Sequence, residues 1–377
     1  MRTLNRWLSL LAAFLLLQVA MYAQDYQSKV SGNWNALGTW EQWDGSAWIA
    51  ATAYPTASNS SSIAIKSLHV VTLTGAVSIA MDDLVIEAGA TLSNTGGCHS
   101  WNDGAAAVDV RIFGTYTASS TCGGFGCCGV VHVENGGILN YNLEGYIFGP
   151  LVVQAGGTVN GNTTIYAQST IVNNGTWNMA ASRDLRVFGA FANFTNNGTL
   201  NLAAGGIIDS PLTNNGLINW SGGTLTGTGT ITNSSTGTIA ASIAGSDRLS
   251  CNLNNAGTIT YTGASQWDTG GGTFTNSGAI NINAGYWVME HTFNNTGTIN
   301  LSAGRTIYFN GTTNLNAGTT FAGTGQIYQQ TGTVTQNFSW TNSAYHWIKQ
   351  GGTWNNTAGN PTVLASGSAF TWQTGTI

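Results

Sequence analysis

A short phrase recurs along most of the chain and constrains its fold more than any other feature. The phrase is Gly, often Thr, an apolar residue and then often Asn, as in Gly175–Asn178, Gly198–Asn201 and Gly297–Asn300. Looser copies begin at Gly114, Gly137, Gly157, Gly216, Gly237, Gly257, Gly278, Gly318, Gly332, Gly352 and Gly375. Most neighbouring copies lie 18 to 23 residues apart. A period of about twenty residues indicates a stacked array of structural repeats.

Within each copy, apolar and polar residues alternate with the period of a β-strand. Trp177 and Met179 fall on one side, whereas Thr176 and Asn178 fall on the other. The apolar side should face the interior, because each buried side chain contributes about 1.5–3 kcal/mol. The Asn-Asn pair before the glycine suits a tight turn, since Asn and Gly tolerate left-handed backbone angles. These features predict an all-β, right-handed parallel β-helix of roughly fourteen coils.

The composition narrows the class of protein. Only 7% of the residues are charged, against about a quarter in ordinary soluble domains. Hydrophobic residues make up 42% and include 14 Trp, which excludes a disordered polar chain. The net charge of −5 argues against nucleic acid as a partner, because that binding needs clustered Lys and Arg.

The first 23 residues have the features of an export signal. Arg2 and Arg6 precede an apolar core from Leu8 to Ala20, and a cleavage site after Ala23 is plausible. A membrane anchor is the alternative, but the apolar core is short for a permanent span. We therefore expect a signal peptide at residues 1–23, a secreted or cell-surface location, and no membrane span after signal removal.

Residues 24–85 differ from the rest because they are rich in Trp and lack the repeated phrase. We expect them to form an N-terminal cap that shields the first coil of a β-helix spanning residues 86–377. The run of Gly32-Asn33-Trp34, Thr39-Trp40 and Gly89-Ala90-Thr91-Leu92 resembles the opening of secreted β-helix repeat proteins of the Bacteroidetes. That resemblance implies an adhesin-like surface protein, of a kind often exported by the type IX secretion system.

The chain stops within a repeat phrase, at Gly375-Thr376-Ile377. An open solenoid edge favours self-pairing, so we expect a truncated piece of a longer protein, with end-to-end self-association if the end is truly uncapped. A natural stop codon directly after Ile377 would contradict this expectation.

Acidic and aromatic residues recur at a similar distance after the coil glycines. Stacking of the coils would place them on one stripe, where rings could pack on sugar faces and acids could accept hydroxyl hydrogen bonds. The candidate glycan stripe comprises Tyr166, Asp209, Asp247, Trp267, Asp268, Trp287, Glu290, Tyr308 and Tyr328. The alternative is that bulk and charge are merely tolerated at this phase, because a shift of one residue moves a side chain to the other face.

A carbohydrate-active enzyme is the competing function. A glycoside hydrolase needs two carboxylates about 5–10 Å apart, and Asp268 could pair with Asp247 or with Glu290 across neighbouring coils. A polysaccharide lyase would need a basic residue as well. The chain shows no nucleophile elbow, Walker loop or HExxH helix, so a passive adhesive or structural role is preferred and no catalytic residue is assigned.

Four of the five cysteines lie close together, at Cys98, Cys122, Cys127 and Cys128. Disulfides are the default for an exported protein, and stacked coils would bring such residues within bonding range. A metal site that adds His99 or His132 is the alternative, but the paired spacing typical of zinc sites is missing. We expect no metal and no cofactor. Cys251 is expected to be a lone small core residue.

The outward Thr and Asn of the repeated phrase allow a third function. Regular Thr rows on a flat solenoid can order water and bind ice, although Leu217 and Ala279 interrupt the Thr position. Such ladders are also ordinary surface stabilisers. The preferred hypothesis is an adhesin-like or structural β-helix that contacts an extracellular glycan or a host or neighbouring cell surface.

Overall fold

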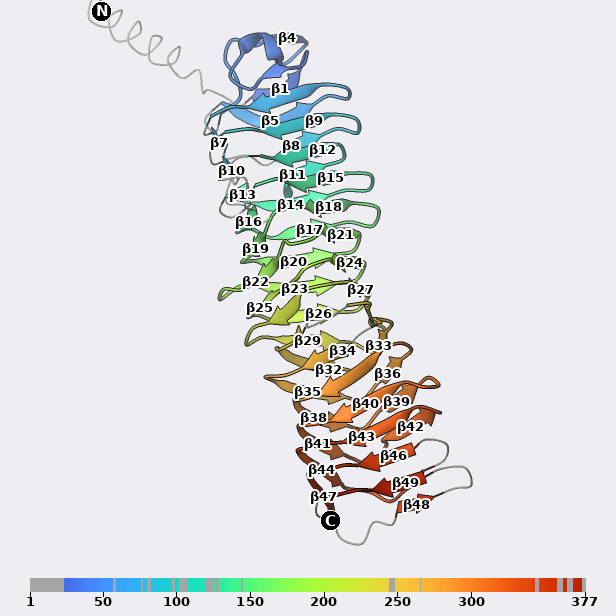
Figure 1. Cartoon of the computed structure of the whole chain (residues 1–377). Coiled ribbons are helices and arrows are strands. Elements are labelled where there is room, and N and C mark those ends of the chain that lie inside the picture. Colours follow the sequence, from blue (N-terminus) through green and yellow to red (C-terminus); the bar gives the residue numbers. More distant parts are fainter. Residues whose placement is uncertain are drawn as a thin grey trace, which may run out of the picture.

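The chain forms a long rod of stacked β-strands, with its N-terminal residues at one end and its C-terminal residues at the other (Figure 1). The computed structural model describes residues 24–374, except for 57–58, 76, 80–82, 97–98, 102–107, 120–124, 127–128, 144, 244–247, 265, 343–345, 358–361 and 365–368. The rod is an all-β solenoid of about 13 turns. The predicted parallel β-helix architecture is confirmed.

Each full coil contributes one strand to each of three sheets, which we call sheets A, B and C. Sheet A stacks β5 (Ser60–Ile65), β8 (Asp83–Ile86), β11 (Val108–Ile112), β14 (Val130–Val133), β17 (Leu151–Val153), β20 (Thr170–Asn173), β23 (Asn193–Asn196), β26 (Leu212–Asn214), β29 (Thr230–Asn233), β32 (Asn252–Asn255), β35 (Thr273–Asn276), β38 (Thr292–Asn295), β41 (Thr312–Leu315), β44 (Thr333–Gln336) and β47 (Thr353–Asn356). Sheet B stacks β2 (Gly32–Asn33), β6 (Val70–Leu73), β9 (Thr91–Asn94), β12 (Thr115–Ala118), β15 (Ile138–Tyr141), β18 (Thr158–Gly161), β21 (Thr176–Met179), β24 (Thr199–Leu202), β27 (Leu217–Trp220), β30 (Thr238–Ala241), β33 (Thr258–Tyr261), β36 (Ala279–Ile282), β39 (Thr298–Leu301) and β42 (Thr320–Gly323). Sheet C stacks β7 (Val77–Ile79), β10 (His99–Trp101), β13 (Phe125–Gly126), β16 (Gly145–Ile147), β19 (Ile165–Ala167), β22 (Leu185–Val187), β25 (Gly205–Ile208), β28 (Thr224–Thr226), β31 (Arg248–Leu249), β34 (Gln266–Thr269), β37 (Tyr286–Met289), β40 (Thr306–Phe309), β43 (Gln326–Gln329), β46 (His346–Lys349) and β49 (Ala369–Trp372). In the last turns, β45 (Trp340–Asn342) and β48 (Thr362–Leu364) pair with each other in a separate two-stranded sheet.

The copies of the repeated phrase from Gly114 to Gly318 form strands of sheet B and stack in register, whereas the copies at Gly332 and Gly352 form β44 and β47 of sheet A. Trp177 of β21 pairs with Leu200 of β24, and Asn178 pairs with Asn201. Because successive residues of a strand face opposite sides, the apolar positions point inward along the whole rod. Five tryptophans of the central and C-terminal coils are less than 2% exposed, namely Trp177, Trp220, Trp267, Trp287 and Trp347.

The glycine of the phrase is required by close backbone packing between coils. A Cβ atom on Gly198 would lie 2.1 Å from the carbonyl oxygen of Gly175, and one on Gly216 would lie 2.2 Å from that of Gly198. Neither glycine has a positive φ, and neither does either residue of the Asn173-Asn174 pair. The expectation of left-handed turn residues is therefore wrong at these positions, whereas the phrase glycines Gly318, Gly332 and Gly352 do have positive φ values. The turn from sheet A to sheet B instead needs a residue without a side chain, because the next coil lies against it.

The asparagine that ends each sheet A strand from β20 to β38 points into the core, and together these residues form a continuous buried column. Its members are Asn173, Asn196, Asn214, Asn233, Asn255, Asn276 and Asn295. The first six side-chain amides each donate to the side-chain oxygen of the next asparagine at 2.6–2.7 Å, and the Asn295 amide donates to the Thr319 hydroxyl at 3.1 Å. We call this set the inner Asn column. It satisfies polar groups that would otherwise be buried without partners at the A–B corner.

The N-terminal end is closed by antiparallel strands. Strand β1 (Gln24–Ser28) pairs with β5 in parallel and with β3 (Trp40–Trp43) in antiparallel fashion, and β3 pairs with β4 (Trp48–Ala50). A single 3₁₀ turn, η1 (Leu37–Thr39), precedes β3. The indoles of Trp34 and Trp40 are buried, and each donates a hydrogen bond to a backbone carbonyl. Parallel pairing already includes β1 and β2, which pair with β5 and β6 within residues 24–85, while the boundary at residue 85 stays a prediction.

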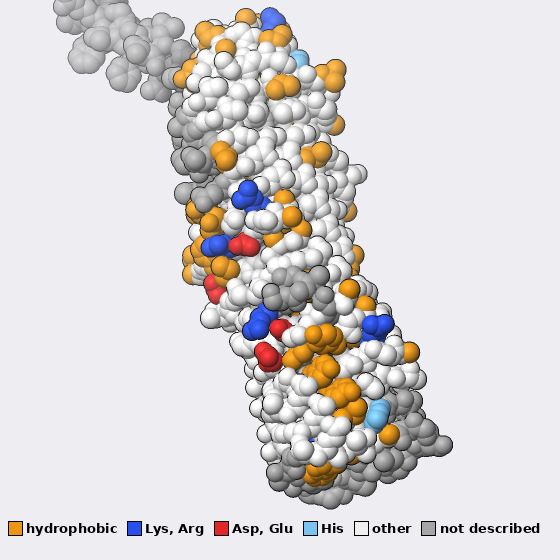
Figure 2. Space-filling model, in the orientation of Figure 1, with side chains coloured by type: hydrophobic (Ala, Val, Ile, Leu, Met, Phe, Trp, Pro, Cys, Tyr) orange, Lys and Arg blue, Asp and Glu red, His pale blue; other side chains and the backbone are white. Residues whose placement is uncertain are grey.

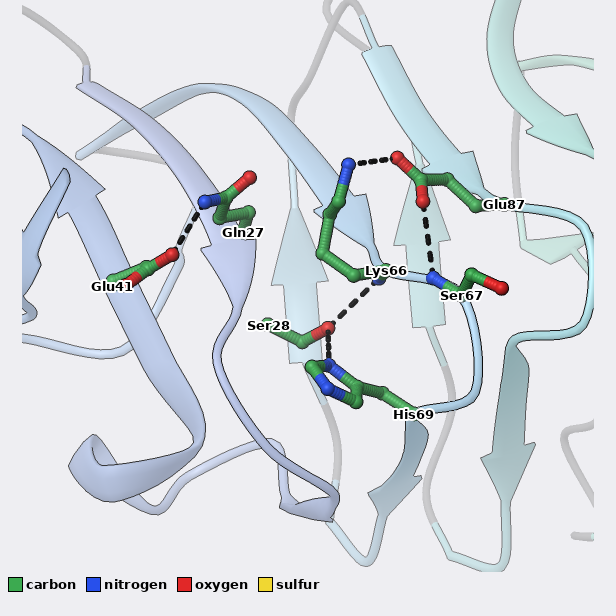
Figure 3. A network of polar contacts seen from close by, with 7 residues as sticks. All are labelled: Gln27, Ser28, Glu41, Lys66, Ser67, His69 and Glu87. Atoms are coloured by element: carbon green, nitrogen blue, oxygen red, sulfur yellow. Dashed lines mark hydrogen bonds and ion pairs between the residues drawn. The ribbon is translucent and has the colours of Figure 1, made fainter.

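Polar side chains join this cap to the first coils (Figure 3). The Ser28 hydroxyl lies 2.8 Å from Nδ1 of His69 and accepts a hydrogen bond from the Lys66 backbone amide. Glu87 pairs with the Lys66 ammonium and accepts a hydrogen bond from the Ser67 amide. Burial raises the pKa of Glu87, but the hydrogen bonds from Lys66 and Ser67 and the nearby positive charges outweigh it, so the pKa is lowered. The carboxylate is therefore held in its charged form at the cap junction.

Two expectations about the ends lie beyond this description. The signal peptide at residues 1–23 and the phrase at 375–377 fall outside the described residues. Among the residues that the structure does describe, none belongs to a helix with the length and apolar character needed to cross a membrane.

Candidate functional site

The predicted stripe residues that the structure describes all belong to sheet C or to the turn that follows it. Tyr166 lies in β19, Trp267 and Asp268 in β34, Trp287 in β37, Tyr308 in β40 and Tyr328 in β43. Asp209 follows β25, and Glu290 follows β37. Asp247 lies outside the described residues. The stripe thus falls on one side of the rod, although its members do not all face outward.

Trp267 and Trp287 are corrections to the predicted stripe, because both rings point into the core. They are 1% and 0% exposed, and their ring centroids stack 4.0 Å apart. Burial of two indoles removes a large apolar area from water, and this fixes the pleat of β34 and β37. The outward positions beside them are Gln266 and Tyr286.

The outer face of sheet C carries two neighbouring rows of side chains along β34–β43. One row runs through Asp268, Val288, Tyr308 and Tyr328, and the other runs through Gln266, Tyr286, Thr306 and Gln326. Tyr308 and Tyr328 of the first row and Tyr286 of the second lie next to one another, and we call these three residues the lower aromatic row. Figure 2 shows hydrophobic side chains gathered along the lower half of the visible face.

The rings of the lower aromatic row contact one another along the rod. Tyr308 and Tyr328 stack with centroids 5.1 Å apart, and Tyr286 meets Tyr308 edge-on at 5.7 Å. The Tyr286 hydroxyl donates to Oε1 of Gln266 at 2.8 Å. Burial, followed by the neighbouring tyrosines, raises the pKa of Tyr308, so its hydroxyl stays protonated at neutral pH. Stacked rings cover part of each other's faces, so this surface offers ring edges, hydroxyls and amides.

Tyr166 belongs to a second aromatic group, higher on the same sheet. Tyr146 stacks on Tyr166 at 4.6 Å and on Phe148 at 5.4 Å. The guanidinium of Arg186 lies 5.5 Å from the Tyr166 ring and 3.5 Å from the Asp184 carboxylate. The register places Tyr146, Tyr166 and Arg186 in one row. The residues predicted as one stripe therefore belong to two separate groups.

Charged side chains lie between the two aromatic groups, in the middle of the face shown in Figure 2. The Arg248 guanidinium is 3.5 Å from the Asp268 carboxylate, whose side chain is 8% exposed. Asp268 also accepts a hydrogen bond from the Gln266 amide. The carboxylate is therefore already paired within the sheet.

Two of the described acidic residues, Asp209 and Asp268, already have partners within the protein. Asp209 accepts hydrogen bonds from the backbone and hydroxyl of Thr228, which is a turn-stabilising role. Glu290 is exposed on a turn beside Gly270. An interior cavity of about 20 Å³ is lined by core residues such as Leu225, Ile239 and Trp267, and such a volume holds about one water. Within the described residues, no group of three or more His, Cys, Asp or Glu could hold a metal ion.

Four of the cysteines cannot be placed. Cys98, Cys122, Cys127 and Cys128 lie outside the described residues, so their disulfides stay a prediction. Cys251 is buried and free, as expected for a lone core residue. Burial raises the pKa of its thiol to about 12, which keeps it protonated and unreactive.

The comparisons with known proteins add no assignment. Searches against protein-family models, curated proteins and solved structures found no significant match to this chain.

Proposed function

We propose that this chain is a secreted or cell-surface rod of the adhesin-like type, which holds a neutral polysaccharide against the outer face of sheet C. The observation that carries the proposal is the lower aromatic row, in which Tyr286, Tyr308 and Tyr328 lie beside Gln266 and Gln326 on one flat sheet face.

The scaffold supports a passive role. Parallel pairing continues from coil to coil through sheets A and C, so the side chains on one face keep a fixed spacing of about 4.8 Å along the rod. Hydrogen-bonding groups at a fixed spacing suit a long polymeric partner, because several units of the partner can contact the sheet at once.

The chemistry of the row favours a neutral sugar chain. Tyr hydroxyls and Gln amides both donate and accept hydrogen bonds, as sugar hydroxyls require, and the ring edges give apolar contact. Asp268, which lies in the same row of sheet C as Tyr308 and Tyr328, is paired with Arg248. A neutral polysaccharide therefore matches this surface better than a strongly charged one.

Binding of the purified chain to a glycan array tests this proposal. We expect retention of one or more neutral polysaccharides, and loss of that retention in the double variant Tyr308→Ala/Tyr328→Ala. The control is Tyr146→Ala with Tyr166→Ala, which removes an equal aromatic pair from the upper group of the same sheet. No retention by the unaltered chain, or equal retention by both double variants, would contradict the proposal.

The same panel separates a binder from a carbohydrate-active enzyme. Incubation with each retained polysaccharide should produce no new reducing or unsaturated ends, because the carboxylates of Asp209 and Asp268 already have partners within the protein. Appearance of such ends would replace the binding role by a catalytic one.

A further inference from the structure

The outer face of sheet A changes character along the rod. In the N-terminal half, the central outward position of successive strands is occupied by Val85, Arg111, His132, Val152 and Val172. From β29 to β47, the yellow to red part of Figure 1, every outward position is Thr or Asn. Charged and apolar side chains are both missing from these outward positions.

Two rows in register make up this C-terminal part of the face, which we call the Thr/Asn face. One row contains Thr230, Asn252, Thr273, Thr292, Thr312, Thr333 and Thr353, and the other contains Thr232, Asn254, Thr275, Asn294, Asn314, Thr335 and Asn355. Each strand contributes one residue to each row, two positions apart, and the residues pair in register with their neighbours.

The spacing of the two rows forms a rigid lattice. Neighbouring coils are about 4.8 Å apart, and residues two apart in a strand are about 6.6 Å apart. Thr is β-branched and holds a restricted χ1 angle on a strand. The side chains of this face therefore present hydroxyl, amide and methyl groups at fixed intervals in two dimensions.

The threonine hydroxyls of this face are available to an outside partner. Within the described part of the chain, the hydroxyls of Thr232, Thr275 and Thr335 have no hydrogen-bond partner in the protein. On sheet B, by contrast, the hydroxyls of Thr298 and Thr320 bond to each other at 2.7 Å. A hydroxyl without an internal partner is hydrated, and a fixed lattice of such hydroxyls holds its hydration water in a fixed pattern.

The identity of the partner follows from what this face lacks. A charged polymer or a lipid headgroup would need opposite charge on the protein, and these two rows have none. Sugar chains are usually held by aromatic rings, and here the rings lie on sheet C. The partner that fits this face is neutral and presents hydrogen-bonding groups every several ångströms in two directions. The surface of an ice crystal has these properties.

We propose that the Thr/Asn face of sheet A binds ice through water ordered by its two rows of threonine and asparagine. This role is separate from the glycan contact proposed for sheet C, since the two faces share no residue. It also places the ice-binding surface on sheet A, whereas the repeated Gly-Thr phrase had indicated sheet B.

Partition into a slowly growing ice front and thermal hysteresis of the purified chain test the proposal. We expect the chain to enter the ice and to shape its crystals. The double variant Thr275→Tyr/Thr335→Tyr should lose both effects, because two large rings interrupt the flat lattice. The gentler double variant Thr275→Val/Thr335→Val keeps the shape, removes two hydroxyls and should show reduced hysteresis.

The matched control is Thr260→Tyr, which places the same ring at the equivalent outward position of β33 in sheet B. This variant should retain ice partition. Far-ultraviolet circular dichroism should show an unchanged β-sheet spectrum for every variant. Absence of ice partition by the unaltered chain, or equal loss in the sheet A and sheet B variants, would overturn the proposal.

Discussion

Two columns of asparagine run along this rod, and they make nearly the same hydrogen bond in different surroundings. In the inner Asn column the amide-to-oxygen distances are 2.6–2.7 Å. The outer column, on the solvent side of sheet B, contains Asn140, Asn160, Asn178, Asn201 and Asn219, with distances of 2.7–2.9 Å. The bond lengths are similar, but the two columns differ in burial.

This difference shows that the surroundings of such a hydrogen bond decide how much it contributes to the stability of the fold. Asn214 is 0% exposed, and its amide also donates to the carbonyl oxygens of Gly216 and Thr238. Loss of its side chain would leave buried groups without partners, whereas groups of the outer column would turn to water. The inner Asn column should therefore hold the A–B corner together, while the outer column adds little stability.

The largest effect is expected for Asn214→Asp. The side chain keeps its shape, but a carboxylate would face the Asn233 oxygen and the two carbonyls that now accept from the amide. An uncompensated buried charge costs about 3–5 kcal/mol. Thermal unfolding at neutral pH should show the loss. Burial would raise the pKa of this carboxyl in the folded state, so stability should recover as the pH falls, and equal loss at all pH values would contradict this explanation.

The next largest effect is expected for Asn214→Ala. The amide of Asn196 loses its acceptor and the oxygen of Asn233 loses its donor. Each unsatisfied buried group costs about 1–3 kcal/mol, so the free energy of unfolding should fall by about 2–4 kcal/mol. Hydrogen exchange should accelerate most at the A–B corners of the adjoining coils, and a change spread evenly along the rod would contradict a local role.

A buried titratable group provides a contrast with the amides, which do not ionise. His291 is 1% exposed, and neither of its ring nitrogens has a hydrogen-bond partner of normal geometry within the described residues. Burial lowers its pKa, and the nearby backbone of Cys251 and Thr269 opposes this only in part. The folded protein therefore binds the proton less readily than the unfolded chain, and stability should decrease as the pH falls below about 6.5.

Thermal unfolding of the unaltered chain and of the His291→Gln variant between pH 7 and pH 4 checks this effect. The variant should lose part of the pH dependence. If stability depends on pH equally steeply in the variant and in the unaltered chain, other titratable groups cause the pH dependence. We expect this effect to be smaller than that of either Asn214 substitution, because only one coil corner is involved.

The smallest effect is expected for Asn178→Ala in the outer column. Asn178 bonds to Asn160 and Asn201, but these amides are half-buried and reach water. The free energy of unfolding should change by less than about 0.5 kcal/mol. A loss comparable with that of Asn214→Ala would show that the two columns contribute equally, and would remove the distinction made here.

Several features of the fold could be predicted from particular residues. The Gly175-Thr176-Trp177-Asn178 phrase and its copies indicated a stacked β-solenoid, and their inward and outward positions in sheet B agree with the structure. The inner Asn column was not foreseen, although an asparagine shortly before many of the phrase glycines was the signal for it. Turn preference alone cannot show that this asparagine points inward, because the corner geometry sets that direction.

The candidate stripe shows where residue counting fails. Trp267 lies ten residues after Gly257, and Tyr328 lies ten residues after Gly318. Trp267 is nevertheless buried, whereas Tyr328 is half-buried on the outer face. The turn between sheets B and C differs in length from coil to coil, so the same count leads to opposite sides of the pleat.

The sequence by itself determined the period, the β-strand alternation and the uncharged surface, because each of these is a local pattern that repeats. Only the tertiary structure decided which side chains of sheets A and C face solvent, and therefore where an aromatic row or a Thr/Asn lattice lies. The physical reason is that hydrogen bonding between coils and burial of large rings set the register of each strand, and both depend on neighbours about twenty residues away in the chain.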